Sequence, residues 1–156
     1  MVTDGAPDPA GTDPPGSTVR LPWLLRRVNQ RYRAAIRDRL AERGVGDLPQ
    51  PGFWAVMVLA HGGTEATELA FEMGVSKQAV SKLVNTLVAA GFVDRRTNDT
   101  DRRRTDLLLT AKGLEAAGII DAAVRETEAD LEAEIGDARF AVLVRGLQLL
   151  ARKPDR

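Results

Sequence analysis

The sequence has no cysteine and a single histidine among 156 residues. The missing cysteine excludes a thiol switch and a thiolate metal site. His61 precedes Gly62-Gly63 and has no second histidine or cysteine as a partner, so we interpret it as a helix-end residue rather than a metal ligand or general base. The sequence also lacks a Walker loop, a G-x-S-x-G elbow and an H-E-x-x-H pair. We therefore predict no enzyme, no metal and no cofactor.

Long apolar runs are missing as well. No stretch approaches the roughly 18 apolar residues expected of a membrane span. The first residues lack the basic start and apolar core of a signal peptide. We expect a cytoplasmic protein without membrane contact. Four prolines, three glycines and three aspartates in the first 16 residues predict that residues 1–18 form a disordered tail.

The formal net charge is zero, but charge is strongly segregated along the chain. Between Arg20 and Arg43 there is a net charge of +6, and between Glu115 and Asp137 a net charge of −7. Segregation of this kind lets a neutral chain present a basic surface to a polyanion while an acidic helix faces away. With 44% hydrophobic and only 4% aromatic residues, the chain suits one core of moderate size.

Residues 67–113 predict two short helices across a glycine turn, followed by an arginine-rich hairpin. Gly74 ends the first helix, and Ser76 is placed to cap the second. Two helices joined by so tight a turn are typical of a DNA-reading motif, whose second helix lies in the major groove. The spacing predicts an apolar face on the first helix at Leu69, Ala70 and Met73, and on the second at Val75, Ala79, Val80, Leu83, Val84 and Leu87.

The opposite face of the second helix carries side chains that all donate hydrogen bonds. Glutamine and asparagine can pair with adenine, lysine with guanine or phosphate, and serine with either kind of group. An ordinary solvated helix face is the alternative interpretation. The predicted major-groove residues are Ser76, Lys77, Gln78, Ser81, Lys82 and Asn85.

The hairpin follows Gly91, with one strand starting at Phe92-Val93 and its partner at Thr105–Leu109. Residues 95–104 are then the tip, and residues 75–105 carry a net charge of +4. A basic ribbon tip follows phosphates or inserts an arginine into a narrow minor groove. A solvated edge that resists aggregation is the alternative. The arginines concerned are Arg95, Arg96, Arg102, Arg103 and Arg104.

In its order of motifs this stretch resembles the MarR-type transcriptional regulators. The resemblance implies that Asp101 steadies the wing through an ion pair and that Arg103 reaches the minor groove. Because three arginines are consecutive here, Arg102 or Arg104 could take that place instead. The matching motifs are ELA (Glu68 to Ala70), GVS (Gly74 to Ser76), VSKLVNTLVAAGFV (Val80 to Val93), D-x-R (Asp101, Arg103) and LxLTxxG (Leu107, Leu109, Thr110, Gly113).

Long amphipathic helices are predicted over Leu21–Arg43, Thr110–Glu134 and Phe140–Arg152. Their apolar stripes exceed what a small winged domain covers, so they either fold back as an all-α cap or pair with another subunit. The resemblance implies the second arrangement, a homodimer on a pseudo-palindromic site with half-sites roughly 34 to 36 Å apart or a multiple of that. Arginines of the first helix are also expected to pair with acids of the penultimate helix.

The predicted fold is mainly α with a small β-hairpin wing, divided into a tail (1–18), an N-terminal dimerisation helix (19–50), a winged helix-turn-helix domain (51–110) and C-terminal dimerisation helices (111–156).

The resemblance also implies a small aromatic or phenolic ligand between the dimer helices and the winged domain. Trp23, Arg27, Phe53, Trp54 and Met57 are the candidate lining residues, because they place apolar and cationic groups near that junction. Core packing is the alternative and the favoured interpretation, since the chain has few aromatic residues from which to build a core.

The leading hypothesis is a homodimeric, sequence-specific DNA-binding regulator, a repressor more often than an activator in the family it resembles. A winged-helix module that binds protein is the alternative hypothesis, although such modules commonly lose the basic wing. An enzyme is the weakest hypothesis. Salt dependence separates the first two, because phosphate contacts weaken steeply as salt rises.

Overall fold

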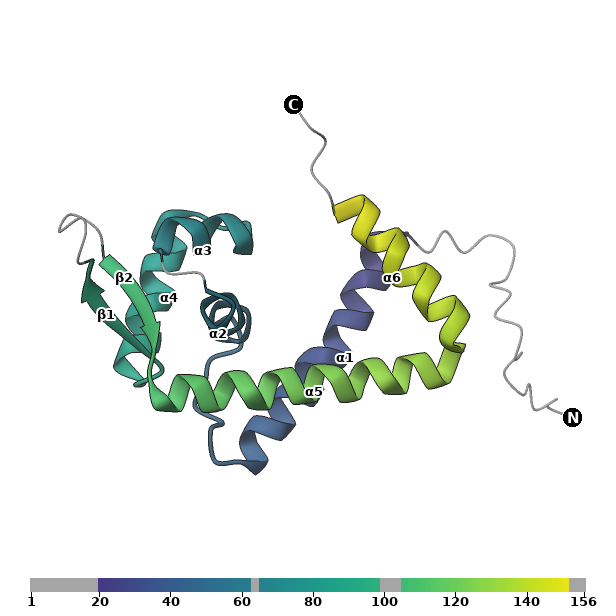
Figure 1. The fold of residues 1–156 in the computed structure, drawn as a ribbon, viewed down its shortest axis with the longest axis horizontal. Coiled ribbons are helices and arrows are strands. Elements are labelled where there is room, and N and C mark those ends of the chain that lie inside the picture. Colours follow the sequence, from purple (N-terminus) through teal and green to yellow (C-terminus); the bar gives the residue numbers. More distant parts are fainter. Residues whose placement is uncertain (1–19, 63–64, 99–104, 152–156) are drawn as a thin grey trace, which may run out of the picture.

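The computed structural model describes residues 20–62, 65–98 and 105–151. In these ranges the chain forms six helices and one two-stranded antiparallel sheet, which confirms the predicted mainly α fold with a hairpin wing (Figure 1). The predicted tail, residues 1–18, lies outside the described residues. The elements are α1 (Leu21–Glu42), α2 (Gly52–Ala60), α3 (Ala66–Met73), α4 (Lys77–Ala89), β1 (Val93–Thr97), β2 (Thr105–Leu109), α5 (Ala111–Ile135) and α6 (Asp137–Ala151).

Local capping signals set the helix boundaries around the turn. Gly74 ends α3 with a φ of 64°, in the left-handed region that favours glycine. Ser76 then caps α4, its Oγ accepting a hydrogen bond from the Ala79 amide at 3.2 Å. Thr110 caps α5 in the same way through the Gly113 amide at 3.0 Å. These caps confirm the predicted helix-turn-helix boundaries.

The last helix begins earlier than predicted. Its first residue is Asp137 rather than Phe140. Gly136, with a φ of 83°, ends α5, and α6 begins at the next residue. Asp137 also places a negative charge in the first turn of α6, where the helix dipole favours it.

The core lies where α2, α4, α5 and the hairpin meet. Val80, Val84 and Leu87 of α4 are buried in it, and Leu83 is half-buried, as the spacing predicts. The prediction is wrong for Val75 and Ala79, which are exposed. Val75 lies in the turn before α4, and Ala79 lies about 100° around the helix from Val80, beyond the edge of the apolar stripe.

The wing is a two-stranded ladder in which Val93 pairs with Leu109 and Thr97 with Thr105. Arg95 and Arg96 are therefore strand residues, and the prediction that they belong to the hairpin tip is wrong. Residues directly opposite in such a ladder share a face. Arg95 shares its face with the buried Leu107, whereas Arg96 lies opposite Asp106 on the other face. Glu65 adds a one-residue bridge to Asp106, which the sequence did not predict.

The two long helices α1 and α5 lie against each other, with the hairpin at one end of α5 and α6 at the other (Figure 1). Arg31 donates to Glu134 at 2.9 Å, and Arg39 forms an ion pair with Glu126. Both pairs join α1 to α5, which confirms the predicted pairing of basic and acidic helices. Within the described ranges, no helix is long and apolar enough to cross a bilayer.

The Arg31–Glu134 pair makes the stability of the α1–α5 contact depend on pH. The hydrogen bond from Arg31 holds the pKa of the Glu134 carboxyl below its ordinary value. A carboxyl with a lowered pKa stabilises the fold above its unfolded pKa of about 4.3, and this contribution is lost as pH falls through the folded pKa. In Arg31→Ala we expect the pKa of Glu134 to return to its ordinary value in an NMR titration. Arg27→Ala, which removes an exposed arginine from the same helix, is the control and should leave that pKa unchanged.

Candidate nucleic-acid interface and ligand cavity

The second helix of the helix-turn-helix, α4, presents one donor-rich face to solvent. Its opposite face is held in the core through Val80, Val84 and Leu87. An exposed polar face on so firmly packed a helix has a fixed direction, as a groove-reading helix requires. All six predicted major-groove residues are exposed: Ser76, Lys77, Gln78, Ser81, Lys82 and Asn85.

The wing adjoins this face through a side-chain hydrogen bond. Arg95 Nη2 donates to Asn85 Oδ1 at 2.6 Å, so β1 is tied to the exposed side of α4. Arg96 is exposed on the other face of the hairpin. The Arg95 guanidinium therefore lies beside the donor-rich helix, and the Arg96 side chain lies on the face of the wing that is turned away from it. The remaining predicted wing residues, Asp101, Arg102, Arg103 and Arg104, lie outside the described residues.

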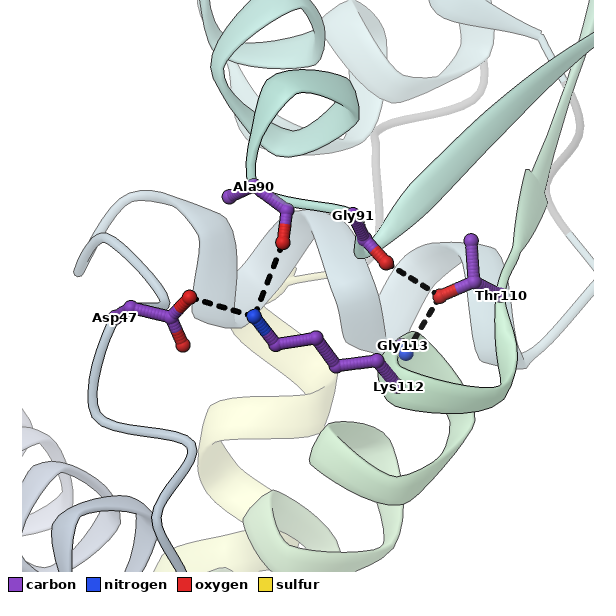
Figure 2. Close-up of polar contacts among 6 residues, drawn as sticks. All are labelled: Asp47, Ala90, Gly91, Thr110, Lys112 and Gly113. Carbon is purple, nitrogen blue, oxygen red and sulfur yellow. Dashed lines mark hydrogen bonds and ion pairs between the residues drawn. The ribbon is translucent and has the colours of Figure 1, made fainter.

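A polar junction fixes the base of the wing to α5 (Figure 2). Lys112 Nζ donates to Asp47 Oδ2 at 2.5 Å and to the Ala90 carbonyl at 3.0 Å, and it lies 4.2 Å from the centre of the Phe92 ring. Thr110 Oγ1 donates to the Gly91 carbonyl at 2.6 Å. The end of α4, the start of α5 and the loop before α2 thus meet at one place. Sequence reasoning used Thr110 and Gly113 as motif residues but missed Lys112 and Asp47.

A cavity of about 900 Å³ opens between α1, α2, α3 and α5. Of the predicted lining residues, Phe53, Trp54 and Met57 do line it. Trp23 and Arg27 lie outside this lining, nearer the start of α1. Trp23 lies under Arg26, whose guanidinium carbon is 4.9 Å from the ring centre.

Phe53 is buried within the single chain, whereas Trp54 is not. Trp54 is 57% exposed and lines the cavity. Met57 is half-buried and contributes to both the core and the cavity wall.

Polar groups that the sequence did not single out complete the cavity wall. The lining of α1 includes Asn29, Tyr32, Arg33 and Ile36, whose spacing of three and four residues places them on one helix face. Burial, reinforced by Glu128, raises the pKa of the Tyr32 hydroxyl, so it is protonated at neutral pH.

His61 lines the same cavity and caps the end of α2, which confirms its prediction as a helix-end residue. Its Nδ1 lies 2.7 Å from the Met57 carbonyl. Since a carbonyl only accepts, Nδ1 carries the proton and Nε2 is the nitrogen left for a ligand. Glu68 and Glu72 of α3 add carboxylates to the lining. The cavity thus combines aromatic surface with groups of both charges.

A capped helix-turn-helix followed by a basic two-stranded hairpin defines a winged helix-turn-helix protein. Residues 47–104 match the model of the MarR family. The chain is 34% identical over 105 residues to a putative transcriptional regulatory protein for the hcr operon of Thauera aromatica. That match covers 66% of this chain and 63% of the relative, so it spans less than two thirds of the relative's length. The match to the MarR family thus covers residues 47–104, the segment that carries the helix-turn-helix.

Solved structures agree on the fold. A MarR-family protein of Mycobacterium tuberculosis in complex with salicylic acid is 28% identical, with a TM-score of 0.62 over 86% of this chain and 98% of that one. The transcriptional repressor CouR, bound to a 23-mer DNA duplex, is 23% identical with a TM-score of 0.69 over 85% and 93%. The apo form of MarR from E. coli is 21% identical with a TM-score of 0.64 over 86% and 98%.

Proposed function

We propose that this protein is a transcriptional regulator that binds operator DNA as a homodimer, and that it acts as a repressor by occupying a promoter. The observation that carries the proposal is the exposed donor face of α4, which the core anchors and which Arg95 ties to the wing. The structure of CouR on a DNA duplex supports it by fold. In this proposal Arg103, or its neighbour Arg102 or Arg104, enters the minor groove, and Asp101 steadies the wing.

Exposed apolar surface at both ends of the chain supports a homodimer. In α1 the predicted stripe is buried at Ile36 and Leu40 but exposed from Leu21 to Val28. The α6 helix has no buried residue in the part that the structure describes. An all-α cap within one chain would bury these surfaces, so a second subunit is the better partner for them. We keep residues 19–50 and 111–156 as the proposed dimerisation segments around a reading domain at 51–110.

Titration of a promoter fragment over a salt series tests the DNA-binding proposal. Each phosphate neutralised by lysine or arginine steepens the fall of affinity with salt, so we expect a steep slope. Lys82→Ala should weaken binding to all sequences and make the slope shallower, whereas Gln78→Ala should relax the preference at one base pair per half-site. A binding partner that is a protein, held by apolar contact, would give an affinity that barely responds to salt.

The cavity supports regulation by a small aromatic or phenolic ligand. The salicylic acid complex of the M. tuberculosis relative is consistent with this class. The chain has two tryptophans, of which Trp54 lines the cavity and Trp23 does not. We expect salicylate to quench the tryptophan fluorescence of the wild type and of Trp23→Phe, and to leave that of Trp54→Phe unchanged. Quenching that survives in Trp54→Phe would place the ligand elsewhere.

A regulator of this family acts by binding rather than by turnover, so we propose no enzymatic activity. The proposed function also carries with it a cytoplasmic location, where operator DNA is accessible.

A further inference from the structure

Arg95 and Arg96 are neighbours in β1, but they reach different surroundings. Arg95 shares its hairpin face with the buried Leu107, and this face is turned toward α4. Its guanidinium reaches Asn85, at 2.6 Å between Nη2 and Oδ1. Arg96 lies on the opposite face across from Asp106. Only the first of these two arginines therefore contacts the exposed face of α4.

The contact fixes which end of the Asn85 amide is used. A guanidinium donates and never accepts, so its partner is the amide oxygen. The oxygen keeps a second lone pair, but another donor would have to approach it beside the cationic guanidinium. The amide NH2 group, a pure donor, is therefore the end that most readily serves another molecule. Bidentate pairing with adenine needs both ends, since the oxygen accepts from N6 while the nitrogen donates to N7. A charge-assisted bond to Arg95 is stronger than the neutral bond that adenine N6 would offer in its place.

We propose that Arg95 is a specificity-determining residue that acts through Asn85. By holding the amide oxygen, it turns Asn85 from an adenine reader into a donor that selects a hydrogen-bond acceptor. That acceptor is guanine N7 or O6, thymine O4 or a phosphate oxygen. The inference rests on the proposed DNA-binding function and deepens it, because it assigns one wing arginine to base selection rather than to backbone contact.

The test compares Arg95→Met with Arg96→Met, each of which removes one guanidinium and keeps an aliphatic side chain. Each protein selects its bound sequences from a random DNA pool. We expect Arg95→Met to gain a preference for adenine of about tenfold at one base pair in each half-site. Arg96→Met should keep the wild-type base profile. Adding Asn85→Ala to Arg95→Met should abolish the gain, because the released amide is then absent.

A second readout follows the contact without DNA. The side-chain NH2 signals of Asn85 in an NMR spectrum should shift in Arg95→Met and stay in place in Arg96→Met. Thermal unfolding of both variants shows that each one folds. Identical base profiles in the two variants would overturn the inference, and so would unmoved Asn85 signals.

The single variant Asn85→Ala identifies the acceptor. Loss of preference at one base pair indicates a base edge, whereas equal weakening on all sequences indicates a phosphate oxygen. A wild-type protein that selects no common sequence would instead remove the proposed function, and the inference with it. Wild-type selection that persists unchanged in Arg95→Met removes the inference alone.

Discussion

Gly113→Ala is expected to lower the free energy of unfolding by about 3 kcal/mol or more. Gly113 lies in the first turn of α5 and is buried against the wing. A Cβ at this position would lie inside contact distance of the Phe92 carbonyl oxygen and 3.1 Å from Leu109 Cδ2. The carbonyl is held in place, because it accepts a hydrogen bond from the Thr110 amide at 3.1 Å and belongs to a fully buried residue. Either α5 or the hairpin must therefore shift.

Gly118→Ala is the matched control, in the same helix and one and a half turns further on. A Cβ at Gly118 meets no atom within 4 Å, and the residue is exposed. Alanine is favoured over glycine inside a helix by about 1 kcal/mol, so this variant should be slightly more stable than the wild type. Denaturant unfolding of both variants measures the difference. A Gly113→Ala protein as stable as Gly118→Ala would show that α5 does not seat on the Phe92 carbonyl.

The helix-turn-helix could be predicted from the sequence because the signals that set its boundaries are local. Gly74, Ser76 and Thr110 each act on their own turn or helix end, so a single chain segment contains the whole cause. The donor face of α4 follows from the same logic. Its apolar and polar residues alternate with helical spacing, so burying one face exposes the other.

The cavity could not be predicted in the same way, because no single segment contains it. Trp54 belongs to α2, whose sequence GFWAVMVLA is apolar all round. Spacing gives no contrast in such a helix, so it leaves open which residues face the core and which face a cavity. Tyr32, Arg33 and Glu68 come together only once α1, α2 and α3 are packed. Lys112 was missed for a similar reason, since its partner Asp47 is 65 positions away in the sequence.

The exposed stripe of α6 leads to a second large expected effect. Val142, Leu143, Leu149 and Leu150 lie on one side of the helix, while Val144 and Leu147 lie on another side and are half-buried. If this stripe joins two subunits, two aspartates in place of Val142 and Leu149 put four unpaired charges in the interface of a dimer. Burying such charges is costly enough to separate the subunits.

We expect the double variant Val142→Asp, Leu149→Asp to be monomeric in analytical ultracentrifugation and to bind a two-half-site operator about 100- to 10,000-fold more weakly than the wild type. A dimer gains affinity by avidity because it binds with two helix-turn-helix domains, and a monomer loses that gain without any change in α4. Affinity for a single half-site should therefore be nearly unchanged. This result would separate loss of the dimer from damage to the helix-turn-helix. Gln148→Asp is the control, since this exposed residue lies on the far side of α6 from the stripe. A double variant that stays dimeric would show that the α6 stripe is not part of the interface.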